Sequence, residues 1–285
     1  MNHSLLGAHF SIAGGLHKAF DHADKYNCTA MQIFTQNSHT WKIRELTENE
    51  IETFLLRKEH SGVINITAHT GYLINLAGAD AEKRCKSFDA MKAELFRAER
   101  LGIKNLVLHP GSHMKTSVTD GIKRLSESIN RLFDQTPSDD TTILLETTAG
   151  QGNSIGHRLD DIEHTINAIE NRARIGICID TCHVFAAGYD ISTETGYKTF
   201  IDEIDSRFGL DAVKCIHMND SKKKAGAKVD RHEHIGMGCI GDMAFKLIMN
   251  DAGFTHAPKI LETPAELDGA DMIAKNLSKL ISFID

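Results

Sequence analysis

Short apolar runs rich in β-branched residues recur along the chain, and six of them end on a histidine or a carboxylate. The six runs are NITAHT at His69, NLVLHP at His109, TILLET at Glu146, GICIDT at Asp180, VKCIHMND at His217 and KILETP at Glu262. Runs of this length and composition are typical of buried strands. The pattern therefore predicts that metal-ligand side chains are delivered from successive strand ends to one place.

The spacing of the apolar runs predicts a barrel of alternating strands and helices. The predicted strands begin near Leu5, Ala30, Asn65, Asn105, Thr142, Ile175, Val213 and Lys259. Intervals of roughly 25 to 45 residues leave room for a helix between parallel neighbours. Helical spacing of apolar residues spans 80–101 and 119–133, with Thr119 or Asp120 as the expected N-cap, and a last helix is expected near 268–283. We expect eight strands and eight helices in an α/β fold, a (β/α)₈ TIM barrel.

Length and composition fit a single domain over residues 1–285. A chain of 285 residues with 41% hydrophobic content matches the roughly 250 residues plus insertions typical of such a barrel. We find no internal repeat, low-complexity tract or linker rich in Pro, Gly or Ser. A core of this size does not need metal to fold.

The cysteines and the hydropathy pattern predict a reduced, cytoplasmic protein. The six cysteines form no paired framework, and we see neither a secretory leader nor an apolar run of about 18 residues. Cys178 and Cys182 flank Asp180, so a thiolate site is an alternative, but we favour small residues packed in a tight strand. No membrane contact is expected, and a monomer is assumed.

Three more residues of metal-ligand type lie just beyond predicted strand ends. His183 follows Asp180 by three residues in CIDTCHVFAAGYD, so both side chains can face one cavity where the strand turns into a loop. Asp230 and His232 form a D-x-H pair after the seventh strand. The nine candidates, five histidines and four acids, are enough for two or three ions and suit Zn²⁺, with Mn²⁺ or Fe²⁺ as substitutes. His9, which lacks a partner motif, is assigned a supporting or structural role.

Clustered divalent ions indicate phosphodiester hydrolysis, because together they polarise the phosphoryl oxygens and neutralise the leaving oxygen. Five basic residues accompany the late ligands: Lys222, Lys223, Lys224, Lys228 and Arg231. Such a run is usually a solvated loop, but beside a metal pocket it can hold a polyanion. The net charge of −7 argues against nucleic acid as a partner. Three divalent ions would bring that charge to about −1, which removes the objection.

Several motifs follow one another in a fixed order from the N-terminus to the last strand. They are GAHFSIAGGL, FTQNSHTW, AHTGYLINL, LHPGSH, LETTAGQG, GICIDTCHVFAAGYD, HMNDSK, VDRHEHIGMGCIG and ILETP. Through these motifs nearly the whole chain resembles the endonuclease IV family of apurinic/apyrimidinic (AP) endonucleases. The resemblance implies a (β/α)₈ barrel that holds three zinc ions.

The resemblance also implies how the nine ligands are shared. The three implied sets are His69, His109 and Glu146; Glu146, Asp180, His217 and Glu262; and His183, Asp230 and His232. Glu146 would thus bridge two ions, and Glu146 and Glu262 are the residues assigned to catalysis. His234 matches no ligand of the family and is expected at the surface.

The implied reaction is hydrolysis of double-stranded DNA on the 5′ side of an abasic site, giving a 3′-hydroxyl and a 5′-deoxyribose phosphate, together with cleaning of damaged 3′ ends. In the family, the loops after strands two and three enter the DNA. Tyr72 and Leu73 occupy matching positions, with ordinary packing as the alternative. Arg231 and His39 are further candidate DNA contacts. His39 stands where arginine is usual and Thr147 where asparagine is usual, so altered DNA affinity or altered pH dependence is expected before altered chemistry.

Two other functions compete with this interpretation. A sugar isomerase or epimerase would use Glu146, Asp180, His217 and Glu262 for one or two ions, but it leaves the remaining histidines unexplained. A zinc-stabilised module that binds damaged DNA without cutting it is the second, although a barrel of this size does not need structural zinc.

Overall fold

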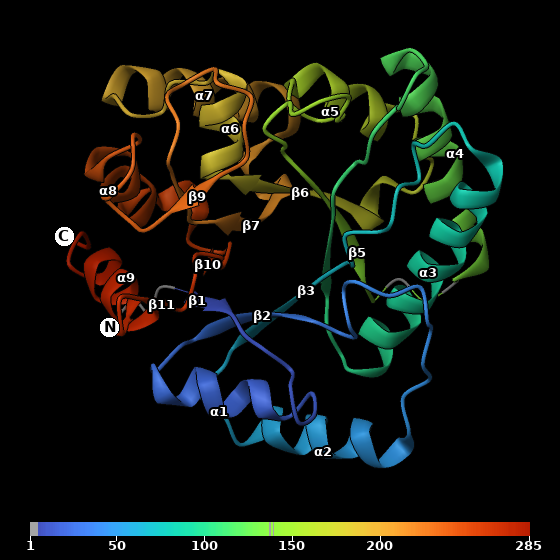
Figure 1. Cartoon of the computed structure of the whole chain (residues 1–285), viewed down its shortest axis with the longest axis horizontal. Coiled ribbons are helices and arrows are strands. Elements are labelled where there is room, and N and C mark those ends of the chain that lie inside the picture. The colour runs from blue at the N-terminus through green and yellow to red at the C-terminus, as the bar shows by residue number, and fades with distance from the viewer. Residues whose placement is uncertain (1–4, 137, 139) are drawn as a thin grey trace.

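The computed structural model describes residues 5–285 except 137 and 139. Eight parallel strands form a closed barrel, and helices surround it (Figure 1). In order around the barrel the strands are β1 (Leu6–His9), β2 (Ala30–Phe34), β3 (Asn65–His69), β4 (Asn105–Leu108), β5 (Thr142–Glu146), β6 (Ile175–Asp180), β7 (Val213–His217) and β10 (Lys259–Leu261), which closes on β1. The predicted TIM barrel and its eight strands are confirmed.

Nine α-helices are found within the described ranges, one more than the sequence predicted. They are α1 (Lys18–Lys25), α2 (Glu48–Glu59), α3 (Ala81–Arg100), α4 (Val118–Gln135), α5 (Leu159–Asn167), α6 (Thr181–Ala187), α7 (Glu194–Phe208), α8 (Asp242–Asn250) and α9 (Met272–Ile281). The additional helix is α6, which begins directly after β6, where the sequence predicted a loop. None of the nine is both long and apolar enough to cross a membrane.

The predicted N-cap of α4 is wrong by two or three residues. Ser117 has the extended backbone of an N-cap, and its hydroxyl accepts a hydrogen bond from the Asp120 backbone N–H at 3.1 Å. The Asp120 carboxylate in turn accepts from the Ser117 hydroxyl at 2.7 Å. Serine and aspartate are both favoured at helix starts, so the chain offers several candidate caps within one turn.

Short elements join the barrel strands to the helices. Three 3₁₀ turns lie at Arg172–Arg174, Leu210–Ala212 and Ala252–Phe254. Two small antiparallel sheets pair β8 (Asp220–Ser221) with β9 (His232–Glu233), and β11 (Glu266–Leu267) with β12 (Ala270–Asp271). The first of these sheets belongs to the long segment after β7, which carries two of the predicted ligands.

Alternation along the strands separates two packed layers. Ile179 on β6 joins the large core between the barrel and the helices, whereas Cys178 belongs to a smaller cluster. That smaller cluster consists of Ala30, Val107, Leu144, Cys178, Cys215 and Ile260, each from a different strand. Because side chains alternate between faces, these residues point into the barrel, and the next inward positions on β5 and β6 are Glu146 and Asp180. The carboxyl ends of the strands therefore present acids toward the barrel axis.

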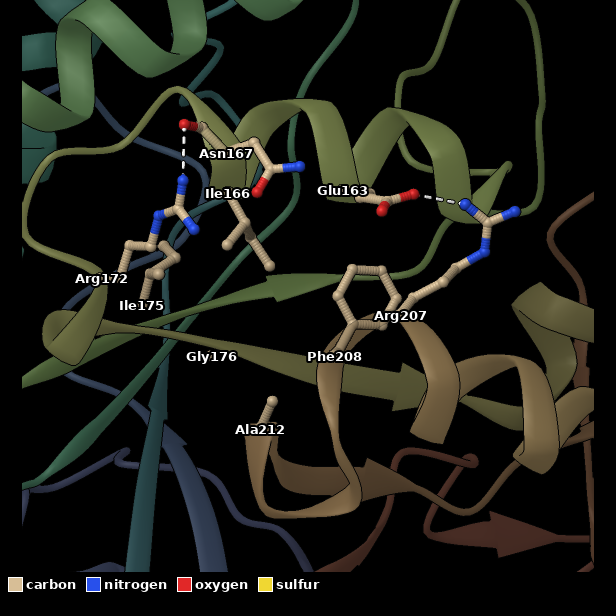
Figure 2. Close-up of a pocket in the computed structure, with 9 residues that line it drawn as sticks. All are labelled: Glu163, Ile166, Asn167, Arg172, Ile175, Gly176, Arg207, Phe208 and Ala212. Carbon is tan, nitrogen blue, oxygen red and sulfur yellow. Dashed lines mark hydrogen bonds and ion pairs between the residues drawn. The ribbon is translucent and has the colours of Figure 1, made fainter.

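A pocket of about 250 Å³ lies at the other end of the barrel (Figure 2). Ile175 and Gly176, the first residues of β6, line it together with residues of α5 and α7. Figure 2 shows the Arg207 guanidinium turned toward the Glu163 carboxylate, with which it forms an ion pair, while the Arg172 guanidinium donates to the Asn167 backbone carbonyl. In barrels of this type the amino ends of the strands serve stability, and chemistry takes place at the opposite face.

Candidate metal centre

The nine predicted ligands converge at the carboxyl ends of the strands. Four are the last residues of strands: His69 on β3, Glu146 on β5, Asp180 on β6 and His217 on β7. His109 directly follows β4, and Glu262 directly follows β10. The other three are His183 on α6, Asp230 in the segment before β9, and His232 on β9. Residues from six strand ends, helix α6 and one long segment thus meet at one face of the barrel.

The side chains form three groups, within each of which the donor atoms lie within 4.8 Å of one another. The groups are His69, His109 and Glu146; Glu146, Asp180, His217 and Glu262; and His183, Asp230 and His232. Their membership is the same as that of the three sets implied by the family resemblance. Their role as metal ligands stays a prediction, which the geometry of each group makes specific.

Glu146 joins the first two groups and has no solvent exposure. Its Oε2 atom lies 2.8 Å from His109 Nε2 and 3.1 Å from His69 Nε2. Its Oε1 atom lies 3.0 Å from His217 Nδ1. Burial disfavours the charged form, but the charges of His109 and His217 outweigh it and hold the pKa of Glu146 well below its ordinary value. Glu146 is therefore an ionised carboxylate with one oxygen toward each group.

His217 is the imidazole of the second group. Its Nδ1 atom lies 3.1 Å from Glu262 Oε2 and 3.8 Å from Asp180 Oδ2. Burial opposes protonation, yet the surrounding carboxylates, Glu262 first, raise the pKa of His217 well above its ordinary value. In the absence of a cation, protons neutralise this cluster. A divalent ion would take the place of those protons, because metal binding requires neutral imidazole and ionised carboxylate.

The third group leaves one buried nitrogen without a hydrogen bond. Asp230 Oδ2 lies 3.1 Å from His183 Nε2, and Asp230 Oδ1 lies 3.2 Å from His232 Nε2. The short contact to His232 Nε2 lacks hydrogen-bond geometry, so this buried atom has no hydrogen-bond partner within the described part of the chain. Buried polar atoms are seldom left unsatisfied in native proteins. A divalent cation between these three side chains would satisfy the nitrogen, so the residues present fit a metal ion.

Backbone carbonyls determine which ring nitrogens face the ligand groups. His69 Nδ1 donates to the Thr70 carbonyl at 2.7 Å, and His183 Nδ1 donates to the Thr147 carbonyl at 2.9 Å. Because a carbonyl only accepts, each Nδ1 carries a proton and each Nε2 is left to serve as the ligand atom. Thr147 acts here through its backbone, which an asparagine at this position would also provide.

Two buried amides support the second group, and sequence reasoning missed both. The Gln32 amide donates to Glu262 Oε1 at 2.6 Å, and its carbonyl oxygen accepts from His217 Nε2 at 2.8 Å. Asn219 donates to Asp180 Oδ2 at 2.7 Å, and its carbonyl oxygen accepts from the Glu262 backbone at 2.9 Å. Partners of this kind orient ligands and select their tautomers. A signal for Gln32 existed, since it is a polar residue at an inward position of the buried strand β2.

The segment that carries Asp230 and His232 is anchored by Asp220 on β8. The buried Asp220 carboxylate accepts hydrogen bonds from four backbone N–H groups, at Ser221 (2.7 Å), Gly236 (3.0 Å), Gly238 (3.0 Å) and Ile240 (2.9 Å). A Cβ atom at Gly238 would come within 2.5 Å of Asp220 Oδ1, so this close approach requires glycine. Asp220 thereby folds the chain back over the barrel mouth, so that β9 pairs with β8.

The predicted DNA contacts are exposed. Tyr72 and Leu73 are 58% and 37% exposed. The Tyr72 ring lies 6.2 Å from the His69 ring and 5.5 Å from the His39 ring. Arg231 is exposed, as are the four lysines near it. These side chains are accessible to a large partner that covers the ligand groups, and contact with DNA stays a prediction.

The prediction that His234 lies at the surface is wrong. Its side chain is 2% exposed, and its Nδ1 atom lies 3.1 Å from the Asn276 amide nitrogen on α9. The segment after β9 turns inward, which packs His234 against α9 and away from the ligand groups. His9, by contrast, has the expected supporting position: its Nδ1 atom accepts from the Gln32 amide at 3.0 Å.

Comparison with known proteins identifies the family. A family model described as xylose isomerase-like TIM barrel matches residues 20–283. The chain is 47% identical over 259 residues to a probable endonuclease 4 of Geobacter sulfurreducens, covering 91% of this chain and 88% of that protein. It is 44% identical over 281 residues to a probable endonuclease 4 of Citrifermentans bemidjiense, covering 99% of both.

Solved structures agree with this relationship. Endonuclease IV from Thermus thermophilus superposes with a TM-score of 0.86 at 32% identity, covering 98% of both chains. A D-tagatose 3-epimerase-like protein superposes with a TM-score of 0.72 at only 16% identity and shares the fold alone. The chain therefore belongs to the endonuclease IV family, within the xylose isomerase-like TIM barrels.

Proposed function

We propose that this protein is a zinc-dependent AP endonuclease of DNA repair that hydrolyses double-stranded DNA on the 5′ side of an abasic site. The observation that carries the proposal is the meeting of the ligand groups at Glu146, whose two oxygens face different sets of histidines. Adjacent ions that share a carboxylate are typical of phosphodiester hydrolysis. The endonuclease names of the relatives support this choice of reaction.

Imidazole and carboxylate together form a donor set that suits Zn²⁺, with Mn²⁺ or Fe²⁺ as substitutes. Bound divalent ions would supply Lewis-acid chemistry, stabilising negative charge on the phosphate and easing the ionisation of water. The four ligand carboxylates carry about −4, and about +6 from three bound ions would make the mouth of the barrel positive toward DNA. The protein's overall charge of −7 is then compatible with a DNA substrate.

The residues around the mouth would recognise the missing base. An abasic nucleotide leaves the helix at low cost and enters a pocket too narrow for an intact one. Tyr72 and Leu73 would fill the resulting gap in the base stack, while Arg231 and the neighbouring lysines would contact phosphates. The same site would also remove blocking groups from damaged 3′ ends, since that reaction breaks the same type of bond and leaves a 3′-hydroxyl.

Incision of a duplex oligonucleotide with one abasic site tests the proposal. We expect a cut on the 5′ side that disappears after prolonged chelation and returns with Zn²⁺, and no cut in the intact duplex. Binding without cutting by fully metal-loaded protein would favour a damage-binding module. Turnover of a free ketose, without DNA cleavage, would favour a sugar epimerase that uses the Glu146, Asp180, His217 and Glu262 group.

A further inference from the structure

A sulfur-containing cluster lies one layer beneath the candidate metal centre. Cys178 on β6 and Cys215 on β7 are paired across adjacent strands, and neither has any solvent exposure. Their sulfur atoms and a ring nitrogen of His217 lie within 4.8 Å of one another. The hydrolytic reaction proposed above uses neither cysteine.

Strand register explains why these three side chains meet. Cys178 and Cys215 are direct partners in a parallel pair, so both point into the barrel at the same height. His217 is two residues beyond Cys215 and therefore shares its face. The rest of this layer is apolar and consists of Ala30, Val107, Leu144 and Ile260. The cluster thus offers two sulfur donors and one nitrogen donor, and Glu146, the strand partner of Cys178, belongs to the ligand groups above it.

We propose that Cys178, Cys215 and His217 form a binding site for a soft, thiophilic metal ion such as Cd²⁺, Hg²⁺ or Cu⁺. Sulfur ligands select soft ions, whereas the oxygen-rich groups above select harder ones. Each thiol loses its proton to solvent as its sulfur–metal bond forms. Because His217 belongs to both sets, a soft ion here removes a ligand from the second group, a consequence that rests on the proposed metal role of His217. The site is therefore a point at which soft metals inhibit the enzyme.

Titration of metal-free protein with Cd²⁺ tests the site directly. The parent protein would carry Cys85→Ser and Cys239→Ser, which remove the exposed thiols. We expect one equivalent of Cd²⁺ to produce ultraviolet thiolate-to-cadmium charge-transfer absorption. Cys215→Ser should abolish this band and weaken Cd²⁺ binding at least about 100-fold, since even outer-shell changes cost about 10- to 100-fold. A parent without the band, or a Cys215→Ser protein that keeps it, would overturn the proposal.

Cys182→Ser is the matched control, because Cys182 lies beside Asp180 and His232 and is the alternative source of a thiolate signal. The band should survive this substitution, and its loss would move the site away from Cys178 and Cys215. If Cys215→Ser does not fold, cadmium NMR of the parent protein counts the sulfur ligands without any change at Cys178 or Cys215. Two sulfur ligands support the site, and none refutes it.

Competition between a soft metal ion and zinc for His217 can be measured separately. Cd²⁺ added to zinc-loaded protein should release one zinc per molecule, detected with a chelating dye, and Cys178→Ala should prevent that release. Retention of all zinc while the thiolate band forms would contradict the sharing of His217. Incision of abasic DNA by the zinc-loaded protein is measured in parallel. A protein that cuts DNA without showing the band refutes only this site and leaves the proposed function intact.

Discussion

Asp180 Oδ1 accepts a hydrogen bond from the His183 backbone N–H at 2.7 Å, because Asp180 is at once the last residue of β6 and the N-cap of α6. An N-cap side chain bonds the N–H three residues ahead, which accounts for the spacing between these two predicted ligands. The capping bond occupies Oδ1 and leaves Oδ2 facing His232 at 3.6 Å and His217 at 3.8 Å. One hydrogen bond therefore positions ligands of both the second and the third group.

Replacing Glu146 with glutamine should disturb two metal groups at once, because the amide nitrogen cannot accept a metal bond. We expect metal content to fall by about two ions per molecule and incision of abasic DNA to fall at least about 100-fold. Elemental analysis and the incision assay measure the two effects. Glu163→Gln, at the other end of the barrel, is the matched control. A Glu146→Gln protein that kept its full metal content and full incision activity would contradict the assignment of Glu146 as a shared ligand.

Asp220→Asn should release the loop that carries Asp230 and His232. The asparagine amide nitrogen would face N–H groups that now donate to a carboxylate, leaving buried donors unsatisfied at about 1 to 3 kcal/mol. We expect one ion per molecule to be lost while the other two remain, with a large drop in incision. Asp202→Asn, which removes an exposed carboxylate on α7, should change neither quantity. Retention of the full metal content in Asp220→Asn would show that the loop is held by other contacts.

His39→Arg should strengthen binding to abasic duplex and make it more dependent on salt. The side chain is exposed beside Tyr72, where a guanidinium could reach a phosphate. One added phosphate contact steepens the slope of log affinity against log salt by about 0.9. Binding measured over a series of salt concentrations gives this slope. His60→Arg places the same charge after α2, near the amino ends of the strands, and should leave the slope unchanged. An equal slope of log affinity against log salt for both variants would show that the loop after β2, which carries His39, does not contact DNA.

The burial of Lys259 should make the free energy of unfolding depend on pH. Its side chain is 3% exposed, and burial lowers its pKa from 10.5 to about 8. Between these values the unfolded chain holds the proton that the folded protein has lost, so this residue's contribution to the free energy of unfolding increases as pH rises from about 8 to 10.5. The increase is about 3 kcal/mol at most. Below pH 8, Lys259 is charged in both states and destabilises the fold by a constant amount.

Lys259→Met removes this titration. Unfolding of metal-free protein by denaturant, compared for wild type and variant at each pH, isolates the contribution of Lys259. Wild type should gain stability relative to Lys259→Met across the window, whereas Lys246→Met, which removes an exposed lysine on α8, should track wild type. Parallel curves for wild type and Lys259→Met would mean that Lys259 keeps its ordinary pKa in the folded protein.

Much of the candidate site could be predicted from the sequence because its parts are local. A short apolar run identifies a buried strand, and in a barrel the carboxyl end of each strand lies at the face that carries the chemistry. The sequence alone therefore predicts that His69, Glu146 and His217 lie together. The strand beginnings were accurate for the same reason. The N-cap of α4 was not, since Ser117 and its neighbours compete for that role over one turn.

The sequence by itself determined the barrel, its strands and the polar residues at their ends. Each of these features depends on a short run of consecutive residues, namely an apolar strand followed by a polar residue. Only the tertiary structure decided which side chains meet, since that depends on register between strands and on loops that return from a distance. Gln32 reaches His217 across the barrel, 185 positions away in the chain. Cys178 faces Cys215 through the pairing of β6 with β7. His234 is buried by the path of its segment against α9, which no local pattern encodes.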